Sequence, residues 1–480
     1  MKVKQVLIVL LIIIFCSIIS YRLGVLAQMT GALKSIVEPG SMVTEASYII
    51  FTDGTNVYAR DGNTGEIVKS STNASEVIQY AIDNLPNMGG IPMGKIFVKT
   101  GTYKCDTPIN FENKAVIFWG EGKYATNFMF ASGINGINFG NQSQVDLSDF
   151  TLTLNSTNSG HGIFGRIGAS RIGHIRIVDW DENHWGMWIY DSTLYVDHIY
   201  LLGYGDGVLI EEGAYNGYFA GKAGNSLINR LEINLQATGL KTDRVYLELR
   251  ADTPDEWVNL YEFNYVFALS GHTVNDRLRN YANIFLNGTS GPIKHNQFNY
   301  VNLESAQNTF VLKNADDNTF LGGFTWNMNN GINIASNCYH NVFENLHIGG
   351  LNSPGQAITD NAAWKAKPNS FMNIFITGNW TNSVPITVTS ATKLYGISTY
   401  TNNTYTRYSE NSGAKSNCIN GTWIAHDLIS TPSSVQITPT NKRITAVFPN
   451  ANSTHFQVGL WDENGNAITT PEYISWYAEV

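Results

Sequence analysis

The chain has 480 residues, of which 43% are hydrophobic and 12% aromatic, which is the composition of a folded protein. Only 14% of the residues are charged, and the formal net charge is −9 at pH 7. Because nucleic-acid binders need a basic surface, this charge argues against a nucleic-acid partner. The charge remains compatible with three kinds of partner: neutral polymers, surfaces, and acidic substrates that are bridged by cations.

The N-terminus has the pattern of an export segment. Lys2 and Lys4 precede VLIVLLIIIFCSIIS, an apolar run of roughly fifteen residues. A membrane-spanning helix needs about twenty residues, and the small Ala27 follows where a signal peptidase would cut. Residues 1–27 are therefore predicted to be a cleaved signal peptide, with a retained membrane anchor as the alternative. In either case the rest of the chain is predicted to be secreted or displayed on the extracellular cell surface.

Glycosylation sequons and cysteines also fit export. Eight Asn-x-Ser/Thr sequons are compatible with a glycoprotein, although so many asparagines would produce about that number by chance. After the apolar segment only Cys105, Cys338 and Cys418 remain. An odd number of distant cysteines predicts neither a disulfide framework nor a zinc framework.

Residues 28–69 are predicted to form a β-rich lead-in. The stretch SYIIFTDGTNVYARDGNTGEIV indicates a hairpin that turns at Asp61 and Gly62. A helix then follows in SEVIQYAIDNL, with Ser75 as its predicted N-cap. Its apolar face consists of Val77, Ile78, Ala81, Ile82 and Leu85. Such a helix would cover the open end of a following β-structure and protect its strand edges.

One phrase recurs in the second half of the chain: Asn, a spacer, Phe, then alternating apolar residues. It reads NQFNYVNL from Asn296, NTFLGGFT from Asn318, NVFENLHI from Asn341 and NSFMNIFI from Asn369. The copy around Phe320 reads as one residue longer than the others. The underlying template, apolar-x-x-apolar-x-apolar, also begins at Leu147, Ile172, Val196 and Ile228. A repeat of this length, between 20 and 50 residues, indicates a solenoid.

The template ends in strand periodicity, so each copy is predicted to be one turn of a parallel β-solenoid spanning residues 70–420. The four phenylalanines would stack inside it, at Phe298, Phe320, Phe343 and Phe371. The four asparagines would lie at a bend, where Asn tolerates the left-handed conformation and can bond to the next coil. A β-sandwich with many short strands is the alternative, but it gives no reason to repeat one phrase in register.

The helix, Gly89-Gly90, IFVKTGTY and VIFWGEG together closely resemble the N-terminal capping region of the pectate lyase-like (pectin lyase-fold) superfamily. The resemblance covers roughly residues 70 to 400. It implies an all-β fold: a right-handed parallel β-helix with an N-terminal capping helix. Because that superfamily includes polysaccharide lyases, polygalacturonases, tailspike glycosidases and non-catalytic surface proteins, the resemblance leaves the activity open.

Residues 421–480 are predicted to form a small β domain. Prolines interrupt this region, and FQVGLWDENGNAI indicates two strands around a tight turn. The region is similar to terminal β-modules of tail-fibre-like and secreted β-helix proteins, which implies an end cap or a homotrimer.

The densest group of acids and aromatics lies on two neighbouring predicted coils. VDWDENHWGMWIYD follows Ile177, and LGYGDGVLIEEG follows Leu201. Carboxylates supply acid–base groups or cation ligands, and aromatic faces stack on sugar rings. The candidate catalytic residues are Asp181, Glu182 and Asp206. The candidate substrate-binding residues are Asp179, Trp180, His184, Trp185, Tyr204 and Glu211. A structural role is the alternative, with Trp188 in the core and Glu211 in a solvated turn.

Two shorter motifs resemble enzymes of the same superfamily. Asp197-His198 followed by Asp206-Gly207 is similar to a stretch of pectate lyases, which implies a Ca²⁺ ion that binds an acidic sugar. The arginine motif of those enzymes has no clear counterpart, and His174 in the equivalent position one coil earlier favours a structural ladder. Gly160-His161-Gly162 matches a polygalacturonase tripeptide, but the acids expected upstream are missing.

The sequence thus leaves two hypotheses. One is an exported carbohydrate-active protein, a polysaccharide lyase or glycosidase acting on an acidic polysaccharide, with Ca²⁺ as the one cofactor suggested. The other is a non-catalytic cell-surface, adhesin-like or tailspike-like structural protein. In both, the expected partner is a polysaccharide or other glycan.

Overall fold

The computed structural model describes residues 46–190, 193–212, 214–215, 218–219, 226–236, 243–252, 257–269, 280–381, 385–389, 392–401, 404–407, 410–425, 432, 434–441, 444–452 and 455–479. The expected signal peptide or anchor, residues 1–27, and the start of the lead-in lie outside this range. Within the described residues, no helix has the length and apolarity needed to cross a membrane.

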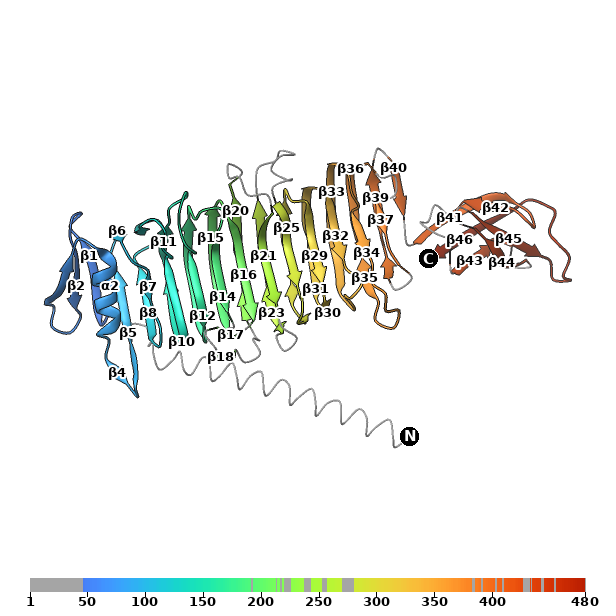
Figure 1. Cartoon of the computed structure of the whole chain (residues 1–480). Helices are drawn as coiled ribbons and strands as arrows, with labels where there is room; N and C mark the ends of the chain where they lie inside the picture. Colours follow the sequence, from blue (N-terminus) through green and yellow to red (C-terminus); the bar gives the residue numbers. More distant parts are fainter. Residues whose placement is uncertain are drawn as a thin grey trace, which may run out of the picture. The chain divides into compact units, whose positions relative to one another are not determined.

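Three ladders of parallel strands build a β-solenoid of about ten turns (Figure 1). Ladder 1 contains β1 (Tyr48–Thr52), β5 (Ile91–Val98), β8 (Ala115–Gly120), the end of β10 (Ile137–Ser148), the starts of β13 (Ser170–Val178) and β15 (Leu194–Gly203), β19 (Ser226–Ile228), β23 (Tyr261–Phe263), β27 (Gln297–Phe298), the starts of β31 (Thr319–Met328) and β33 (Val342–Ser353), β35 (Asn369–Met372) and β38 (Thr392–Tyr395).

Ladder 2 contains β6 (Gly101–Cys105), β9 (Thr126–Phe130), β11 (Phe150–Thr153), the ends of β13, β15, β31 and β33, β20 (Leu231–Leu235), β24 (Val266–Leu269), β28 (Val301–Glu304), β36 (Phe375–Trp380) and β39 (Ser398–Thr401). Ladder 3 contains β7 (Ile109–Asn110), the start of β10, β12 (Ile163–Ile167), β14 (Trp185–Tyr190), β16 (Asp206–Glu212), β21 (Arg244–Ala251), β25 (Asn280–Asn287), β29 (Asn308–Lys313), β32 (Asn330–Ile334), β34 (Ile358–Asp360) and β37 (Ile386–Thr387). A short fourth ladder contains β22 (Val258–Asn259), β26 (Ile293–Lys294) and β30 (Ala315–Asp316).

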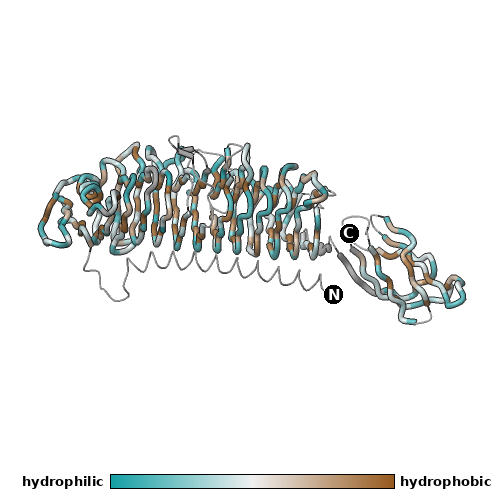
Figure 2. Tube along the Cα trace, turned by 90° about the horizontal axis from the view of Figure 1, so that it is seen from below, coloured by the Kyte–Doolittle hydropathy of each residue, from teal (hydrophilic) through white to brown (hydrophobic). Residues whose placement is uncertain are grey.

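Along many strands, such as β8 and β15, buried residues alternate with partly exposed ones, and Figure 2 shows hydrophobic (brown) and hydrophilic (teal) residues alternating along the trace. The predicted phenylalanine ladder is confirmed. The four rings are fully buried and nearly parallel, with centroid separations of 4.8 Å for Phe298–Phe320, 4.4 Å for Phe320–Phe343 and 5.2 Å for Phe343–Phe371. Phe263 extends the stack by one more coil, at 4.7 Å from Phe298. The repeated phrase is therefore one turn of a parallel β-solenoid.

The asparagines of the phrase form a second buried ladder. The Nδ2 atom of each donates to the Oδ1 atom of the next at 3.0 Å, from Asn296 to Asn318, Asn341 and Asn369. The expected left-handed conformation is, however, absent from these four residues. It is found one residue earlier, at His295, Asp317 and His340, because the asparagine itself must keep its side chain directed into the core to reach the next coil.

The copy around Phe320 is in register with its neighbours rather than one residue longer. Gly323 pairs with Val301 and Leu346, and Thr325 pairs with Leu303 and Ile348. Gly323 has φ +136°, and a Cβ atom on it would lie 2.2 Å from the carbonyl oxygen of Val301. A small residue is therefore required where the other copies have an apolar side chain.

The predicted capping helix is confirmed as α2 (Ala74–Asp83), which packs against the first strands of the solenoid (Figure 1). Its N-cap is Asn73 rather than Ser75, because the Asn73 side chain accepts the N–H of Ser75 at 3.1 Å. The predicted hairpin is formed by β2 (Val57–Asp61) and β3 (Ile67–Ser71), and Asp61 accepts the N–H groups of the turn residues Asn63 and Thr64. A shorter strand, β4 (Asn87–Met88), pairs with the start of β5.

The C-terminal region has its own two sheets and its own core. One sheet joins β41 (Glu410–Cys418), β46 (Glu472–Glu479) and β43 (Ser434–Pro439), and the other joins β42 (Trp423–Ala425), β45 (His455–Trp461) and β44 (Thr445–Ala451). Buried Cys418, Phe456 and Trp476 lie in this separate core. Because β41 starts at Glu410, the pairing in this module includes residues before position 421.

Candidate functional site

The outer surface of ladder 3 carries an unusual row of large side chains. In β12 and β14 the inward residues Ile163, Met187 and Ile189 join the core, while Phe164 and Trp188 point outward and stay half-buried. Strand register places Phe164 opposite Trp188, so neighbouring coils present aromatic rings side by side. We call the outward side chains of ladder 3 the ladder-3 face.

Four rings form the aromatic centre of this face. Phe164 and Trp188 are 5.5 Å apart in an edge arrangement, and Tyr190 stacks beside Trp188 at 5.7 Å with an interplanar angle of 29°. His161 lies 5.1 Å from Phe164, nearly parallel to it, and 5.0 Å from Trp188. The result is a half-buried aromatic surface that spans two coils.

Charged groups continue the face on the next two coils. Trp188 donates its Nε1–H to Glu211 Oε2 at 2.8 Å, and Glu211 lies opposite Arg250 in the strand register. Arg250 donates to both oxygens of the buried Glu248, at 2.8 and 3.0 Å, and Asn287 donates to Glu248 as well, at 2.7 Å. Although burial lowers it, hydrogen bonding and the charge of Glu248 raise the pKa of Arg250. Glu248 is thus fixed by three hydrogen bonds, whereas Glu211 lies at the edge of the aromatic rings.

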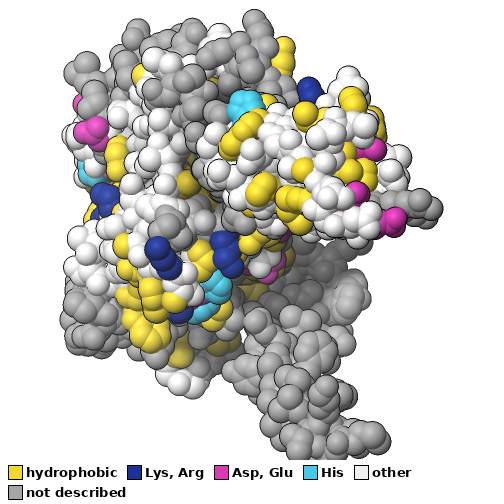
Figure 3. All heavy atoms as spheres, turned by 90° about the vertical axis from the view of Figure 1, so that its right-hand side faces the viewer, with side chains coloured by type: hydrophobic (Ala, Val, Ile, Leu, Met, Phe, Trp, Pro, Cys, Tyr) yellow, Lys and Arg dark blue, Asp and Glu magenta, His cyan; other side chains and the backbone are white. Residues whose placement is uncertain are grey.

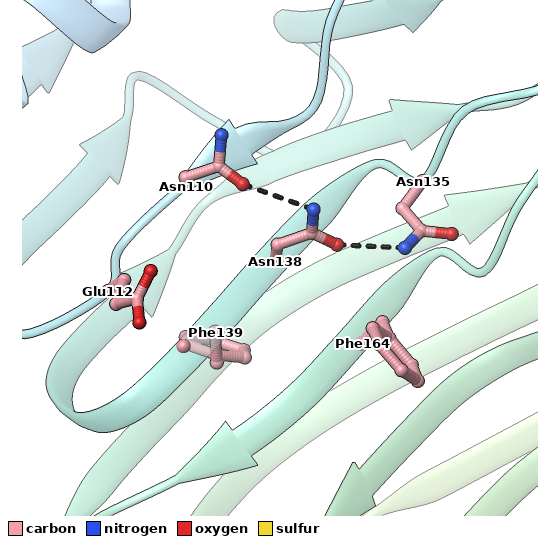
Figure 4. Close-up of a pocket in the computed structure, with 7 residues that line it drawn as sticks. Asn110, Glu112, Asn135, Asn138, Phe139 and Phe164 are labelled. Atoms are coloured by element: carbon pink, nitrogen blue, oxygen red, sulfur yellow. Dashed lines mark hydrogen bonds between the residues drawn. The ribbon is translucent and has the colours of Figure 1, made fainter. Parts of the chain in front are cut away.

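Amide side chains extend the face in the other direction, along an open depression of about 180 Å³ (Figure 4). Asn138 donates to Asn110 at 3.1 Å and accepts from Asn135 at 2.8 Å. Glu112 lies against Gly140 in the same depression, where a Cβ atom would be 2.2 Å from the glutamate side chain. Phe164 borders both the depression and the aromatic rings, so the two parts are continuous.

An aspartate–histidine pair lies beside the aromatic rings. The Asp181 carboxylate accepts the backbone N–H of Ser159 at 2.7 Å and faces His184 Nδ1 at 2.7 Å. Burial alone would raise its pKa, but these hydrogen bonds lower the pKa of Asp181 below its ordinary value. An ionised Asp181 fixes the proton of His184 on Nδ1 and leaves Nε2 as the acceptor. The His184 ring lies 4.9 Å from His161.

His161, the partner of His184 in this ring contact, is kept neutral. His161 Nδ1 accepts the backbone N–H of Trp185 at 3.0 Å. Burial, reinforced by nearby His184, lowers the pKa of His161 to about 4.

The structure separates the other candidates named from the sequence. Trp180 is fully buried and donates to the carbonyl oxygen of Asp206 at 2.9 Å. Asp206 is also buried, and its Oδ1 accepts the N–H of Val245 at 2.8 Å. Both therefore hold the turn between coils, and neither is open to a polymer.

The remaining candidates are spread over different surroundings. Trp185 packs into a small apolar cluster on the ladder-3 face with Leu209 and Phe285. Asp179 is a left-handed corner residue with φ 62°, and burial raises the pKa of its carboxyl. Glu182 and Tyr204 are half-buried turn residues. Of the nine candidates, Glu211 and His184 thus have the closest contact with the aromatic rings.

Several residues of this face were missed in the sequence, among them Phe164, Glu248 and Arg250. Phe164 lies in a coil with no nearby acid, and Glu248 and Arg250 are 37 and 39 residues from Glu211 along the chain. Only the strand register, which pairs Glu211 with Arg250, brings them together.

The pectate lyase-like stretch has a different arrangement. Asp197 pairs with Arg171, and His198 Nε2 lies 3.3 Å from Glu232. His174 and His198 are register partners, as expected for a structural ladder. Among the described residues, no group of three acids, histidines or cysteines has the geometry of a bound metal.

The fold and this face define the chain as a parallel β-solenoid with an aromatic and charged outer strip. No protein-family model and no curated protein matches it. Among solved structures it is similar to ORF18 of Geobacillus virus E2, with 12% identity and a TM-score of 0.48 over 87% of this chain and 85% of that one.

It is also similar to the tailspike protein gp49 of Pseudomonas phage LKA1, with 11% identity and a TM-score of 0.42 over 84% and 92% of the two chains. A third similar structure is a mutant of the PL6 family alginate lyase AlyGC, with 13% identity and a TM-score of 0.35 over 68% and 52%.

Proposed function

We propose that the protein binds an extended acidic polysaccharide along the ladder-3 face. The observation that carries this proposal is the continuous row of sugar-sized features on consecutive coils: amides at Asn110 and Asn138, rings at Phe164 and Trp188, then Glu211 beside Arg250. Because coils repeat about every 4.8 Å, such a row suits a linear polymer lying across the coils.

Three cations in the row would suit acidic groups of a polymer, and they lie among the carboxylates of Glu112, Glu211 and Glu248. Arg166, Arg250 and Lys313 occupy equivalent positions in the strand register, with Tyr190 and Glu211 between the first two. Cations at intervals of a few coils would meet carboxylates at intervals along the polymer, while the rings would cover the apolar faces of its sugars. Figure 3 shows a different view of the molecule, in which charged side chains stand among hydrophobic and uncharged ones.

Titration calorimetry with an acidic and a neutral polysaccharide tests this proposal. Trp188→Ala combined with Tyr190→Ala should weaken binding by about a hundredfold or more, since each ring contributes roughly 1.5–3 kcal/mol of apolar contact. Trp364→Ala is the matched control, because Trp364 is an exposed tryptophan outside the face. If the double variant and the control bind with equal affinity, the proposed site is wrong. If the protein prefers the neutral polymer, the proposed preference for an acidic polymer is wrong.

A specific observation favours a second function, cleavage of the bound chain. His184, oriented by Asp181 and lying next to the aromatic rings, has the arrangement of a general base that could abstract a sugar proton in an elimination. A lyase would release unsaturated products that absorb in the ultraviolet. His184→Ala should then abolish product formation while leaving binding intact; a wild-type protein that binds without forming product is a binding protein only.

We further propose that residues 1–27 export the chain to the cell surface or the medium, that the C-terminal module assembles three copies, and that the chain belongs to the pectate lyase-like superfamily. The apolar run and the separate C-terminal core support the first two. Light scattering of the purified protein would measure a trimeric or a monomeric mass.

A further inference from the structure

Ladder 2 carries a row of outward side chains that has no part in the function proposed above. In six consecutive coils, the strand register places one outward residue of each coil opposite that of the next, while strand neighbours such as Val301 and Leu303 lie in the core. The six are Phe267, Asn302, Phe324, His347, Phe375 and Ser398. We call them the ladder-2 row. All six are at least partly exposed.

Aromatic and hydrogen-bonding side chains alternate along the ladder-2 row. Phenylalanines occupy its first, third and fifth positions, and Asn302, His347 and Ser398 occupy the others. Because coils repeat about every 4.8 Å, the phenylalanines recur about every 9.6 Å. The row therefore offers an apolar ring and a polar group in turn, with a period of two coils.

Ring contacts fix the second half of the row. The centroids of Phe324 and His347 are 5.0 Å apart, and those of His347 and Phe375 are 5.2 Å apart. His347 Nε2 also lies 2.7 Å from Thr377 Oγ1. Burial lowers the pKa of His347, so its imidazole is neutral at pH 7. The rings are thus held in place by one another before any ligand arrives.

A tryptophan widens the apolar surface beside Phe324. The two ring centroids are 6.1 Å apart, with an interplanar angle of 13°. Trp326 is in register with Gly349, and a Cβ atom on that glycine would lie 2.1 Å from Cε3 of the indole. The indole therefore lies against the backbone of the next coil, where a larger residue would displace it.

The charge of the ladder-2 row differs from that of the ladder-3 face. None of its six side chains is charged at pH 7, whereas cations occur at intervals along the ladder-3 face. Glu304, in register with Trp326, adds a negative charge beside the row. A polyanion would meet no cation in the row and one carboxylate beside it, so the row suits an uncharged polymer.

We propose that the ladder-2 row binds a neutral glycan of the cellulose type, lying across the coils. In such a polymer each sugar is turned over relative to the next, so the same apolar sugar face recurs once per disaccharide. A ring on every second coil matches that recurrence, and Asn302, His347 and Ser398 are placed to bond to hydroxyl groups between the rings. Together with the ladder-3 face, and resting on the function proposed for it, the solenoid would link a neutral and an acidic polysaccharide.

Titration calorimetry of the full chain with cellohexaose tests the row. The wild type should bind, and Trp326→Ala combined with Phe375→Ala should weaken binding by about a hundredfold or more, because two rings are lost. Phe375→Ala alone removes a ring that is 39% exposed and should weaken binding by about tenfold without disturbing the core. The matched control is Trp423→Ala combined with Tyr473→Ala, which removes two exposed rings of the C-terminal module and should leave the affinity unchanged. Unchanged circular dichroism shows that each variant is folded.

The acidic polysaccharide separates this proposal from the one for the ladder-3 face. The variant lacking Trp326 and Phe375 should bind the acidic polymer as the wild type does, so the preference of the ladder-3 face is measured on this variant. If the wild type binds the acidic polymer but not cellohexaose, only the ladder-2 proposal fails; the reverse result contradicts only the ladder-3 proposal. Cellohexaose binding that is unchanged in the variant lacking both rings, or lost from the control, would overturn the role of the ladder-2 row.

Discussion

Replacement of Asn318 by alanine is expected to destabilise the solenoid far more than its size suggests. The Asn318 side chain is fully buried and has partners in three coils. Its Oδ1 accepts both the backbone N–H and the side-chain N–H of Asn296, each at 3.0 Å. Its Nδ2 donates to the carbonyl oxygen of Ile293 at 2.9 Å and to Asn341 Oδ1 at 3.0 Å.

The magnitude follows from the groups left without a partner. Alanine at position 318 leaves two N–H donors of Asn296 without an acceptor. It also removes one donor from the carbonyl oxygen of Ile293, in a place that water does not reach. A buried polar group that loses its partner costs roughly 1–3 kcal/mol, so the free energy of unfolding should fall by about 3–5 kcal/mol. On the other side, Asn341 Oδ1 loses the side-chain N–H of Asn318 but keeps its backbone N–H.

Denaturant unfolding followed by circular dichroism measures this loss, and hydrogen exchange locates it. Because each coil contacts only its neighbours, the amides of Asn296 and Thr319 should lose protection while distant coils keep theirs. The matched control is Asn337→Ala, an exposed asparagine with one long hydrogen bond, which should change stability by less than about 0.5 kcal/mol. Equal stability of the two variants would refute the role assigned to the asparagine ladder.

Three further perturbations are expected to have measurable effects. Because the folded protein favours neutral His161, with a pKa of about 4, unfolding free energy should fall by about 3 kcal/mol as pH drops from about 6.5 to 4, and His161→Gln should flatten that dependence in urea titrations. Gly203→Ala would place a Cβ atom 2.3 Å from the buried ring of Trp180 and should cost about 3 kcal/mol, whereas Gly122→Ala, with its nearest contact at 3.6 Å, should be nearly neutral. Phe320→Ala removes a ring stacked on both sides and should cost about 3–5 kcal/mol in thermal unfolding, which a loss below 1 kcal/mol would contradict.

The fold could be predicted because the residues that specify each turn are close together in the sequence and recur in every copy of the phrase. Each copy of the phrase contains its own inward phenylalanine and asparagine, so four copies specify the same turn. The details that were predicted wrongly depend on contacts with residues in neighbouring coils. Whether Asn341 or His340 takes the left-handed conformation is decided by which side chain must reach the next coil.

The site could be predicted only in part, because its residues are related by register and not by motif. Acid and aromatic density pointed to two coils of the proposed face, at Trp185 and Glu211, but it also selected Trp180, which is buried. The nine residues of β13 give no sign that Trp180, two residues beyond the end of the strand, turns inward. Trp180 does so because Gly203 in the next coil leaves room for its ring, a relation that spans more than 20 residues.

Coil length offers a further, sequence-readable guide to where function lies on this solenoid. Ladder 1 advances by 35 residues from Ile228 to Phe263, but by only 22 from Phe298 to Phe320. The minimal coil therefore needs about 22 residues, and longer coils carry surplus chain, part of which forms the antiparallel hairpin of β17 (Ala214–Tyr215) and β18 (Tyr218–Phe219). Glu211 and Arg250 lie on these longer coils, whereas the regular short coils carry the unbroken phenylalanine and asparagine ladders. The charged residues of the proposed face thus lie on coils that are longer than the 22-residue minimum.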